Sequence, residues 1–536
     1  MSVPGPNPRI LPLLRLTNPA APPRPEETPP PNSFRLAVKD NIATYSKDGN
    51  GLPTTCASGI LTSHDSPLEA TIVKQLARRG ARIVGKTNLD EFGMGTHSVN
   101  TSHGAVAQLA VKLEEEEDDD DDKTIRLSAG GSSGGSAVAV QTGAADVALG
   151  TDTGGSVRLP AAYCGVVGYK PSYGMISRYG VVPYANSLDT VGLLARDVRS
   201  VRELVVGGGL HMEHDPRDPT SLSSSARARC TAARKYYDSG ARQRLDDLGN
   251  GDAHKQLLRP LTFGIPVEYN IAELDGCVRD AWEDAARVLR DEVGARVVPV
   301  SLPSTRHALS AYYVIAPAEA SSNLAKYDGV RYGIKQPEIE GDNNSNSSNN
   351  SGGVLYSAVR GEGFGAEVKR RILLGSYTLS SEAMDNYFVQ AQRVRQLVRQ
   401  DFDRVFRLSN PLRDEEDQHF SLAEMSEDVV LENKLGPTQV DFLLCPTAPT
   451  LPPRLEDVQS GQERSPVDAY MNDVFTVPAS LAGLPAVSIP RGVDLPREEG
   501  WRGKGAMGLQ VIGQYWDDAR LLTAAEALST LFKGST

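Results

Sequence analysis

The sequence predicts one large α/β domain, in which helices cover both faces of a central sheet. The same order of helix, glycine and strand occurs twice, at residues 66–85 and 278–300. Strands that alternate with helices at this spacing are typical of an α/β sheet. No internal repeat is evident and no segment suggests a second core. Although 536 residues exceed the usual length of one domain, we therefore expect a single domain.

Short apolar runs predict the strands of this sheet. Each run is four to six residues long or forms part of a helix–glycine–strand unit, and polar residues or prolines bound it. The predicted strands lie at residues 34–38, 82–85, 297–298, 440–445, 485–489 and 508–512.

Helices are predicted where apolar residues recur every three to four positions. The first begins at Ser66 as its N-cap and ends at Gly80, because serine suits an N-cap and glycine a helix end. The second begins near Val278 and ends at Gly294. The last helix follows Asp517 or the aspartate after it, which would cap it.

Low-complexity segments divide the chain further. We expect an N-terminal extension or transit segment at residues 1–33 and the folded domain at 34–536. Residues 1–25 contain arginines and no acid, as organelle transit peptides can; a disordered extension is the alternative. Polar or strongly charged runs, which stay solvated, predict surface insertions. These insertions lie near residues 106–125, 208–256, 336–353 and 410–436.

Composition excludes several classes of protein. The net charge of −12 argues against broad, non-specific binding of nucleic acid. No apolar stretch is long enough to span a membrane. The five cysteines are scattered without C-x-x-C spacing, which argues against a zinc site or a disulfide framework and fits a reducing compartment.

Residues 128–168 contain the strongest chemical signal. Serines lie among paired glycines at Gly130–Ser136 and Gly154–Ser156. A hydroxyl amid inward-turned backbone N–H groups provides a nucleophile and an oxyanion hole for acyl transfer. The alternative is a flexible Gly/Ser linker, but the apolar runs at 137–140 and 147–149 argue against it.

A serine nucleophile needs a base, and histidine is not the obvious one. No G-x-S-x-G elbow surrounds these serines, although a Ser–His–Asp triad could assemble from distant residues. A lysine, whose ordinary pKa is about 10.4, becomes a competent base when burial lowers its pKa. Lys39 is the candidate and Lys170 the competitor. His97 could be a base or metal ligand, but a surface or packing role is favoured because no second ligand lies at metal spacing.

Four motifs, in this order, resemble those of the amidase signature family. The resemblance extends over the chain from about residue 34 to 536, apart from the insertions, and it implies the family's fold, a mixed central sheet between helices. The motifs are Val38–Asn41, Gly130–Ser136, Gly150–Arg158 and Cys164–Pro171.

The resemblance implies a Ser–cis-Ser–Lys triad. Ser156 matches the nucleophile, Ser132 the bridging serine on a cis peptide bond, and Lys39 the base. Asp152 and Arg158 are expected to form a supporting ion pair. The implied oxyanion hole consists of the backbone N–H groups of Thr153, Gly154, Gly155 and Ser156.

The second half resembles one branch of this family, the A subunits of glutamyl-tRNA(Gln) amidotransferases. In that branch an arginine holds the α-carboxylate of glutamine and an aspartate holds its α-ammonium. These roles transfer to Arg371 and Asp473, with Tyr312 beside the substrate. A planar guanidinium suits a carboxylate, but Arg371 could instead be a solvated helix arginine. The matching segments are 312–332, 367–375 and 470–473.

The resemblance therefore implies a glutaminase that supplies ammonia for converting Glu-tRNA(Gln) to Gln-tRNA(Gln). The implied partners are glutamine, the B subunit, a small third subunit, and Glu-tRNA(Gln) bound mainly through the partner. We expect no cofactor or metal in this chain. ATP and Mg are expected on the partner subunit. The basic N-terminus and the insertions resemble those of mitochondrial forms of this subunit. We therefore expect the protein on the matrix side of the mitochondrion.

Two alternatives remain open at this point. The chain could be a stand-alone amidase of the same family that acts on another small amide, such as an apolar or aryl amide. It could also be a non-catalytic assembly subunit that has kept the fold. Arg371 and Asp473 distinguish the first alternative, since a simple amide needs no paired clamp, and the presence of all three triad residues argues against the second.

Overall fold

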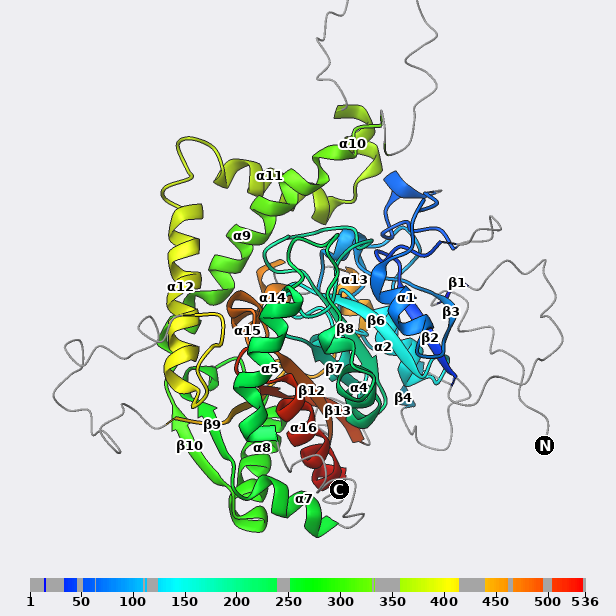
Figure 1. Cartoon of the computed structure of the whole chain (residues 1–536). Helices are drawn as coiled ribbons and strands as arrows, with labels where there is room; N and C mark the ends of the chain where they lie inside the picture. The colour runs from blue at the N-terminus through cyan, green and yellow to red at the C-terminus, as the bar shows by residue number, and fades with distance from the viewer. Residues whose placement is uncertain are drawn as a thin grey trace, which may run out of the picture.

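The computed structural model describes most of the chain, including all four motifs. The described residues are 14–15, 33–45, 52–62, 64–108, 111–112, 124–238, 251–329, 332, 357–413, 439–460, 466–494 and 504–533. Figure 1 shows their arrangement around a central sheet.

Among the described residues, eleven strands form the central sheet, in the order β1-β3-β2-β6-β8-β7-β12-β13-β11-β9-β10. A separate two-stranded sheet pairs β4 (Val111–Lys112) with β5 (Thr124–Ile125). The strands of the large sheet are β1 (Leu14–Arg15), β2 (Phe34–Lys39), β3 (Ala81–Thr87), β6 (Val147–Asp152), β7 (Val167–Lys170), β8 (Thr190–Ala195), β9 (Thr262–Pro266), β10 (Arg296–Val300), β11 (Phe442–Pro446), β12 (Ala486–Asp494) and β13 (Lys504–Ile512).

The sheet is mixed, as the family resemblance implies. Strands β3, β2 and β6 are parallel neighbours, and so are β11, β9 and β10. The strands between these two groups pair antiparallel. Because β2 and β6 run in the same direction, their carboxyl ends meet at one edge of the sheet, which is where α/β folds place their ligands.

Every residue of β6, β7, β8 and β11 is buried. This burial indicates that helices cover both faces of the sheet. The α-helices are α1 (Thr71–Ala77), α2 (Gly134–Gln141), α3 (Arg158–Tyr163), α4 (Val198–Arg202), α5 (Ser224–Asp238), α7 (Gly251–Leu258), α8 (Gly276–Arg287), α9 (Ala308–Asn323), α10 (Ser357–Gly363), α11 (Ala366–Thr378), α12 (Phe388–Val405), α13 (Leu455–Ser460), α14 (Pro466–Met471), α15 (Val477–Ala482) and α16 (Asp518–Lys533).

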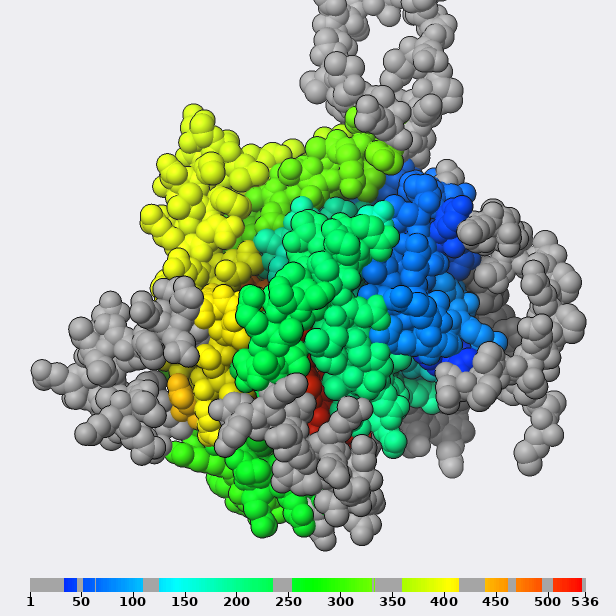
Figure 2. Space-filling view, viewed as in Figure 1, coloured from blue at the N-terminus to red at the C-terminus, as the bar shows by residue number. Residues whose placement is uncertain are grey.

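Helices α9, α11 and α12 form a group beside the sheet, drawn in green to yellow in Figure 1. Gly375 of α11 lies directly on the backbone carbonyl of Pro317 in α9, so any side chain at this glycine would overlap that carbonyl. Glycine therefore allows the two helices to approach closely. Figure 2 shows this helix group meeting N-terminal and central segments in one continuous surface.

The sequence predicts six of these strands and three of these helices and leaves the others unassigned. Each predicted strand coincides with or overlaps a strand of the sheet, and β12 and β13 are longer than predicted. The predicted start of the first helix is wrong. The Ser66 hydroxyl donates to the carbonyl of Leu68 and accepts from its N–H, which makes a local turn that competes with helix. Helix α1 begins only at Thr71.

The linker interpretation of residues 128–168 is also wrong, because these residues form α2, β6, α3 and β7 in the buried interior. The acidic run at 114–122 and the segment 336–353 lie outside the described residues. So do residues 1–13 and most of the segment 410–436. Within 208–256, the described residues contain α5 and most of α7. The division at residue 33 stays a prediction.

Among the described residues, no helix is both long enough and apolar enough to cross a membrane.

Candidate active site

The predicted catalytic residues gather at the carboxyl end of the parallel strands. Lys39 is the last residue of β2, and Asp152 is the last residue of the neighbouring β6. The loop after β6 carries Ser156 and leads into α3. The other serine motif lies just before α2, and the peptide bond between Gly131 and Ser132 is cis.

Lys39 is fully buried and in contact with the first serine motif. Its Nζ lies 2.8 Å from Ser132 Oγ and 2.8 Å from Ser133 Oγ. A third hydroxyl, Thr151 Oγ1, lies 3.0 Å from the same nitrogen and also accepts from Asn41 Nδ2 at 3.0 Å. Three hydroxyls therefore surround the lysine amine.

Hydrogen-bond accounting orients this amine. A neutral lysine has two N–H donors and one lone pair. The Ser133 hydroxyl donates to the carbonyl of Thr151 at 3.3 Å, so it can only accept from Lys39. Thr151 Oγ1 accepts from Asn41 Nδ2 and from Lys39, and with both N–H donors used in this way the lone pair faces the hydroxyl of Ser132. Ser133 thus helps to aim Lys39 at Ser132.

Burial lowers the pKa of Lys39 to about 7, against the opposing effect of Asp90, Asp152 and Asp189. Since a base must be unprotonated to act, we expect kcat for amide hydrolysis to fall about tenfold per pH unit below pH 7 and to level off above it. The measurement is kcat at saturating substrate between about pH 5.5 and 9, made in the assembled enzyme. An acid limb centred near the ordinary lysine pKa would contradict this assignment.

The competing lysine does not reach the serines. Lys170 is buried, and burial lowers its pKa to about 7 as well. Its Nζ donates to the carbonyl of Pro171 at 3.2 Å, at the end of β7. A shifted pKa alone thus does not distinguish the two lysines, but contact with Ser132 and Ser133 favours Lys39.

The two serine motifs are joined through their backbones. The N–H of Ser133 donates to the carbonyl of Ser156 at 3.1 Å, and Ser156 is 8% exposed. In the loop before it, Thr153 Oγ1 donates to Asp189 Oδ1 at 2.8 Å. Hydrogen bonds thus hold the loop at residues 153–156 on both sides; we name it the nucleophile loop after the predicted role of Ser156.

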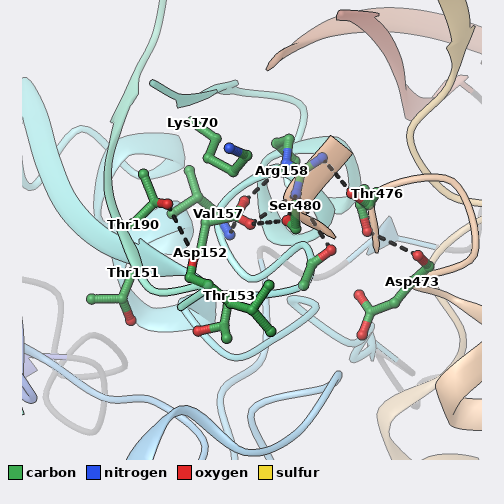
Figure 3. A network of polar contacts seen from close by, with 12 residues as sticks. Thr151, Asp152, Thr153, Val157, Arg158, Lys170, Thr190, Asp473, Thr476 and Ser480 are labelled. Carbon is green, nitrogen blue, oxygen red and sulfur yellow. Dashed lines mark hydrogen bonds and ion pairs between the residues drawn. The ribbon is translucent and has the colours of Figure 1, made fainter. Parts of the chain in front are cut away.

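The expected ion pair between Asp152 and Arg158 is confirmed. Both side chains are fully buried and joined by two hydrogen bonds, of 2.8 and 2.9 Å. Figure 3 shows Arg158 reaching onward to the carbonyl of Thr476 and the hydroxyl of Ser480, at 2.9 and 2.8 Å. The guanidinium also donates to Gln510 Oε1 at 2.7 Å. Arg158 therefore ties the nucleophile loop to the C-terminal part of the chain.

Arg371 is not the solvated arginine of the alternative interpretation, because only 3% of it is exposed. It lies in α11, where its Nε donates to Glu367 at 2.7 Å and its Nη1 donates to Tyr184 Oη at 2.7 Å. The rings of Tyr184, Tyr313 and Tyr470 lie 5.3 to 5.8 Å from the guanidinium carbon. Burial acts to lower the pKa of Arg371, but Tyr184, Tyr313, Glu367 and Tyr312 raise it well above its ordinary value.

Asp473 and Tyr312 lie directly on the nucleophile loop. A side chain at Gly155 would come within 2.8 Å of Asp473 Oδ1, and one at Gly154 within 2.7 Å of the Tyr312 ring. Both glycines are therefore needed for this close approach. Burial raises the pKa of Asp473 to about 7, an effect that Arg371 opposes. The residues with predicted substrate roles thus reach the loop with the predicted nucleophile.

Sequence reasoning assigned no role to several residues around Arg371, although Tyr313, Glu367 and Tyr470 lie in the matching segments. Glu367 lies one helical turn before Arg371, and this four-residue spacing of opposite charges could have revealed it. Tyr470 donates to the same carboxylate at 2.9 Å and stacks on Tyr313 with ring centroids 4.0 Å apart. Tyr184 lies in a distant loop where no sequence pattern marks it. Three tyrosines and one glutamate thus enclose the arginine.

His97 has a packing role, as favoured from the sequence. It is 3% exposed, and its ring nitrogens contact Ser128 Oγ at 2.9 Å and Asn472 Nδ2 at 3.3 Å. Burial lowers the pKa of His97 to about 4. Across the described parts of the chain, no group of three or more His, Cys, Asp or Glu side chains could hold a metal ion.

This fold and these motifs define a class of protein. A family model described as Amidase matches residues 26–522, and the chain belongs to this family, the amidase signature family.

Within this family, the similarity to mitochondrial amidotransferase subunits is high. The chain is 61% identical over 498 residues to the A subunit of the mitochondrial glutamyl-tRNA(Gln) amidotransferase of Podospora anserina, covering 92% of this chain and 89% of the relative. The A subunit of the same mitochondrial enzyme from Neurospora crassa is 60% identical over 515 residues, covering 93% of this chain and 90% of the relative.

A solved structure supports the same relationship. The crystal structure of the A subunit of glutamyl-tRNA(Gln) amidotransferase from Thermotoga maritima has a TM-score of 0.61 and 31% identity. The match covers 92% of this chain and 82% of that one. A 6-aminohexanoate cyclic dimer hydrolase, with 19% identity and a TM-score of 0.61, shares the fold alone.

Proposed function

We propose that this chain is the glutaminase subunit of a mitochondrial glutamyl-tRNA(Gln) amidotransferase. It hydrolyses the side-chain amide of glutamine and supplies the ammonia that converts Glu-tRNA(Gln) to Gln-tRNA(Gln). The observation that carries this proposal is the buried clamp of Arg371 and Asp473 beside the loop that holds Ser156. A free amino acid needs partners for both of its charges when it leaves water, and this pair provides one of each sign.

The clamp sets the orientation of glutamine. Arg371 pairs with the α-carboxylate, because two of its nitrogens are already fixed by Glu367 and Tyr184 and the planar group is preorganised. Asp473 pairs with the α-ammonium. Its raised pKa of about 7 falls when this cation binds, so Asp473 is ionised in the complex. Tyr312 lies beside the substrate.

The reaction then proceeds at the serines. Ser156 Oγ attacks the amide carbon, Ser132 takes its proton, and Lys39 takes the proton of Ser132. The backbone N–H groups of residues 153–156 stabilise the oxyanion. The relay returns a proton to the amide nitrogen and ammonia leaves, so that glutamate is esterified to Ser156. Water, activated by the same relay, attacks the ester and releases glutamate.

The remaining chemistry belongs to the other subunits. The proposed partners are the B subunit and a small third subunit, with Glu-tRNA(Gln) bound mainly through the B subunit. ATP and Mg act there. The match to G-x-x-x-x-G-K-[ST] at residues 80–87 lies in strand β3 and not in a loop that leads into a helix. Both the N-terminal arginines and the names of the relatives support a mitochondrial location, which we propose is the matrix side.

Replacing Arg371 with alanine separates this function from that of a stand-alone amidase. We expect kcat/KM for glutamine to fall about 100-fold or more, because a buried charge-assisted pair is lost. A small aliphatic amide such as propionamide has no α-carboxylate, so its hydrolysis should change far less. Steady-state kinetics with both substrates, in the assembled enzyme, measure the difference.

Arg370→Ala is the matched control. Arg370 also pairs with Glu367, but half of its side chain is exposed, so this substitution should leave both substrates nearly unchanged. Equal losses on glutamine and propionamide in Arg371→Ala would reject the clamp and favour the amidase alternative.

A further inference from the structure

One buried carboxylate, Glu91, connects the catalytic loop to the clamp helix. Glu91 lies in a short 3₁₀ turn, Glu91–Gly93, and is 4% exposed. Its Oε2 accepts the backbone N–H of Gly365 at 2.8 Å, and its Oε1 accepts the hydroxyl of Ser58. Gly365 is the N-cap residue of α11, six positions before Arg371.

The contact with α11 is favourable for two reasons. The first N–H groups of a helix have no partner within the helix, and Glu91 provides one from a different part of the chain. A carboxylate also interacts favourably with the positive end of the helix dipole. Gly365 allows the contact, since any side chain there would overlap Glu91 Oε2. Glu91 thus takes the role that the N3 carboxylate has in a capping box, which accepts the N–H of the N-cap residue.

The other side of the turn contacts the catalytic serine. The backbone N–H of Asp90 donates to the carbonyl of Ser132 at 3.3 Å. A side chain at Gly93, with φ of +79°, would lie 3.6 Å from Ser132 Oγ. The residues on either side of Glu91 along the chain therefore pack against the proposed proton relay, while Glu91 itself holds the clamp helix.

The turn is held in a demanding conformation. Phe92 has φ of +52°, a value that bulky residues adopt only where the surroundings fix them. Its ring packs against Phe364, just before α11, at 5.7 Å between centroids, and against Tyr327 at 5.1 Å. An apolar contact and a hydrogen bond thus join the same turn to the same end of α11.

We propose that Glu91 is a positioning residue for glutamine: it fixes the start of α11 against the Ser132 loop and so sets where Arg371 lies relative to the nucleophile. This inference rests on the proposed function, because it assumes that Arg371 holds the α-carboxylate. Supporting residues around a site commonly affect affinity or activity by about 10- to 100-fold, although they never contact the substrate.

The test compares Glu91→Ala and Glu91→Gln in the assembled enzyme. In Glu91→Ala we expect KM for glutamine to rise about tenfold while kcat changes less than about threefold, because the clamp moves but the serines remain. Propionamide, which does not use the clamp, should be hydrolysed at nearly the wild-type rate. In Glu91→Gln the amide oxygen can accept from Gly365 and the amide nitrogen can donate to Ser58 Oγ, so KM should return close to wild type.

Glu268→Ala is the matched control. Glu268 makes the same kind of contacts, accepting the Ser301 hydroxyl at 2.6 Å and the backbone N–H of Leu302 at 2.8 Å, but neither of these partners belongs to α11. This substitution should leave KM for glutamine unchanged. If Glu91→Ala behaves like Glu268→Ala, or loses glutamine and propionamide equally, the positioning role is rejected.

Hydrogen exchange of the peptide covering residues 360–371 gives a readout that needs no glutamine. We expect faster exchange at the start of α11 in Glu91→Ala and wild-type protection in Glu91→Gln. Ser58→Ala, which leaves the contact with Gly365 intact, serves if Glu91→Ala does not fold, and it should give a smaller rise in KM. If Arg371→Ala leaves KM for glutamine unchanged, the clamp itself is rejected. If Arg371→Ala raises KM but Glu91→Ala leaves it unchanged, the positioning inference is rejected and the clamp is retained.

Discussion

Replacing Ser156 with alanine is expected to abolish the release of ammonia from glutamine. Without Ser156, water would have to attack the amide directly, with no covalent intermediate. Loss of a serine nucleophile in comparable hydrolases lowers kcat by about 10⁴-fold or more. Ser156 lies in a loop held by its neighbours' backbone groups, so the fold should be unaffected. Ammonia release is measured with the assembled enzyme, and glutamine binding by calorimetry.

The binding measurement is the control for this experiment. Because Arg371 and Asp473 are untouched, Ser156→Ala should still bind glutamine with an affinity near that of the wild type. A variant that binds glutamine and still releases ammonia at more than a small fraction of the wild-type rate would reject Ser156 as the nucleophile.

Replacing Arg158 with alanine is expected to cause the largest loss of stability. It leaves the carboxylate of Asp152 buried without its partner, which typically costs about 3–5 kcal/mol. It also removes the hydrogen bonds to Thr476, Ser480 and Gln510. The free energy of unfolding, measured by urea denaturation followed by circular dichroism, should fall by at least this amount.

Arg35→Ala provides the comparison. Arg35 also pairs with an aspartate, Asp146, at 2.6 Å, but both side chains are more than 40% exposed. Such exposed pairs contribute roughly 0–1 kcal/mol. Equal losses in the two variants would mean that the buried pair has no special role.

The sequence predicts six of the strands and three of the helices, for physical reasons, while the chemistry that it implies at the site stays a prediction. Short apolar runs bounded by polar residues or prolines reveal strands, and the glycine motifs show where the chain turns tightly around Ser132 and Ser156. The start of α1 is predicted wrongly because Ser66 can cap a helix or close a local turn, and only the tertiary contacts decide. Strand order is also beyond sequence patterns, since it depends on which distant strands pair.

The residues of the site also divide into those that sequence patterns reveal and those that only the fold reveals. Lys39 and Lys170 both follow buried strands, and proximity to the serines, which depends on the fold, separates them. Tyr184 and Glu91 contact the clamp helix from segments far away along the chain. No spacing or periodicity connects such residues to Arg371. They are found only when the packing of α11 is known.

The hydrogen bonds of Arg158 have a consequence for the order of folding. This arginine, in the first third of the sequence, contacts Thr476, Ser480 and Gln510, which lie 318 to 352 positions further along the chain. The loop that holds Ser156 therefore takes its final form only after the segment 476–510 has packed against it.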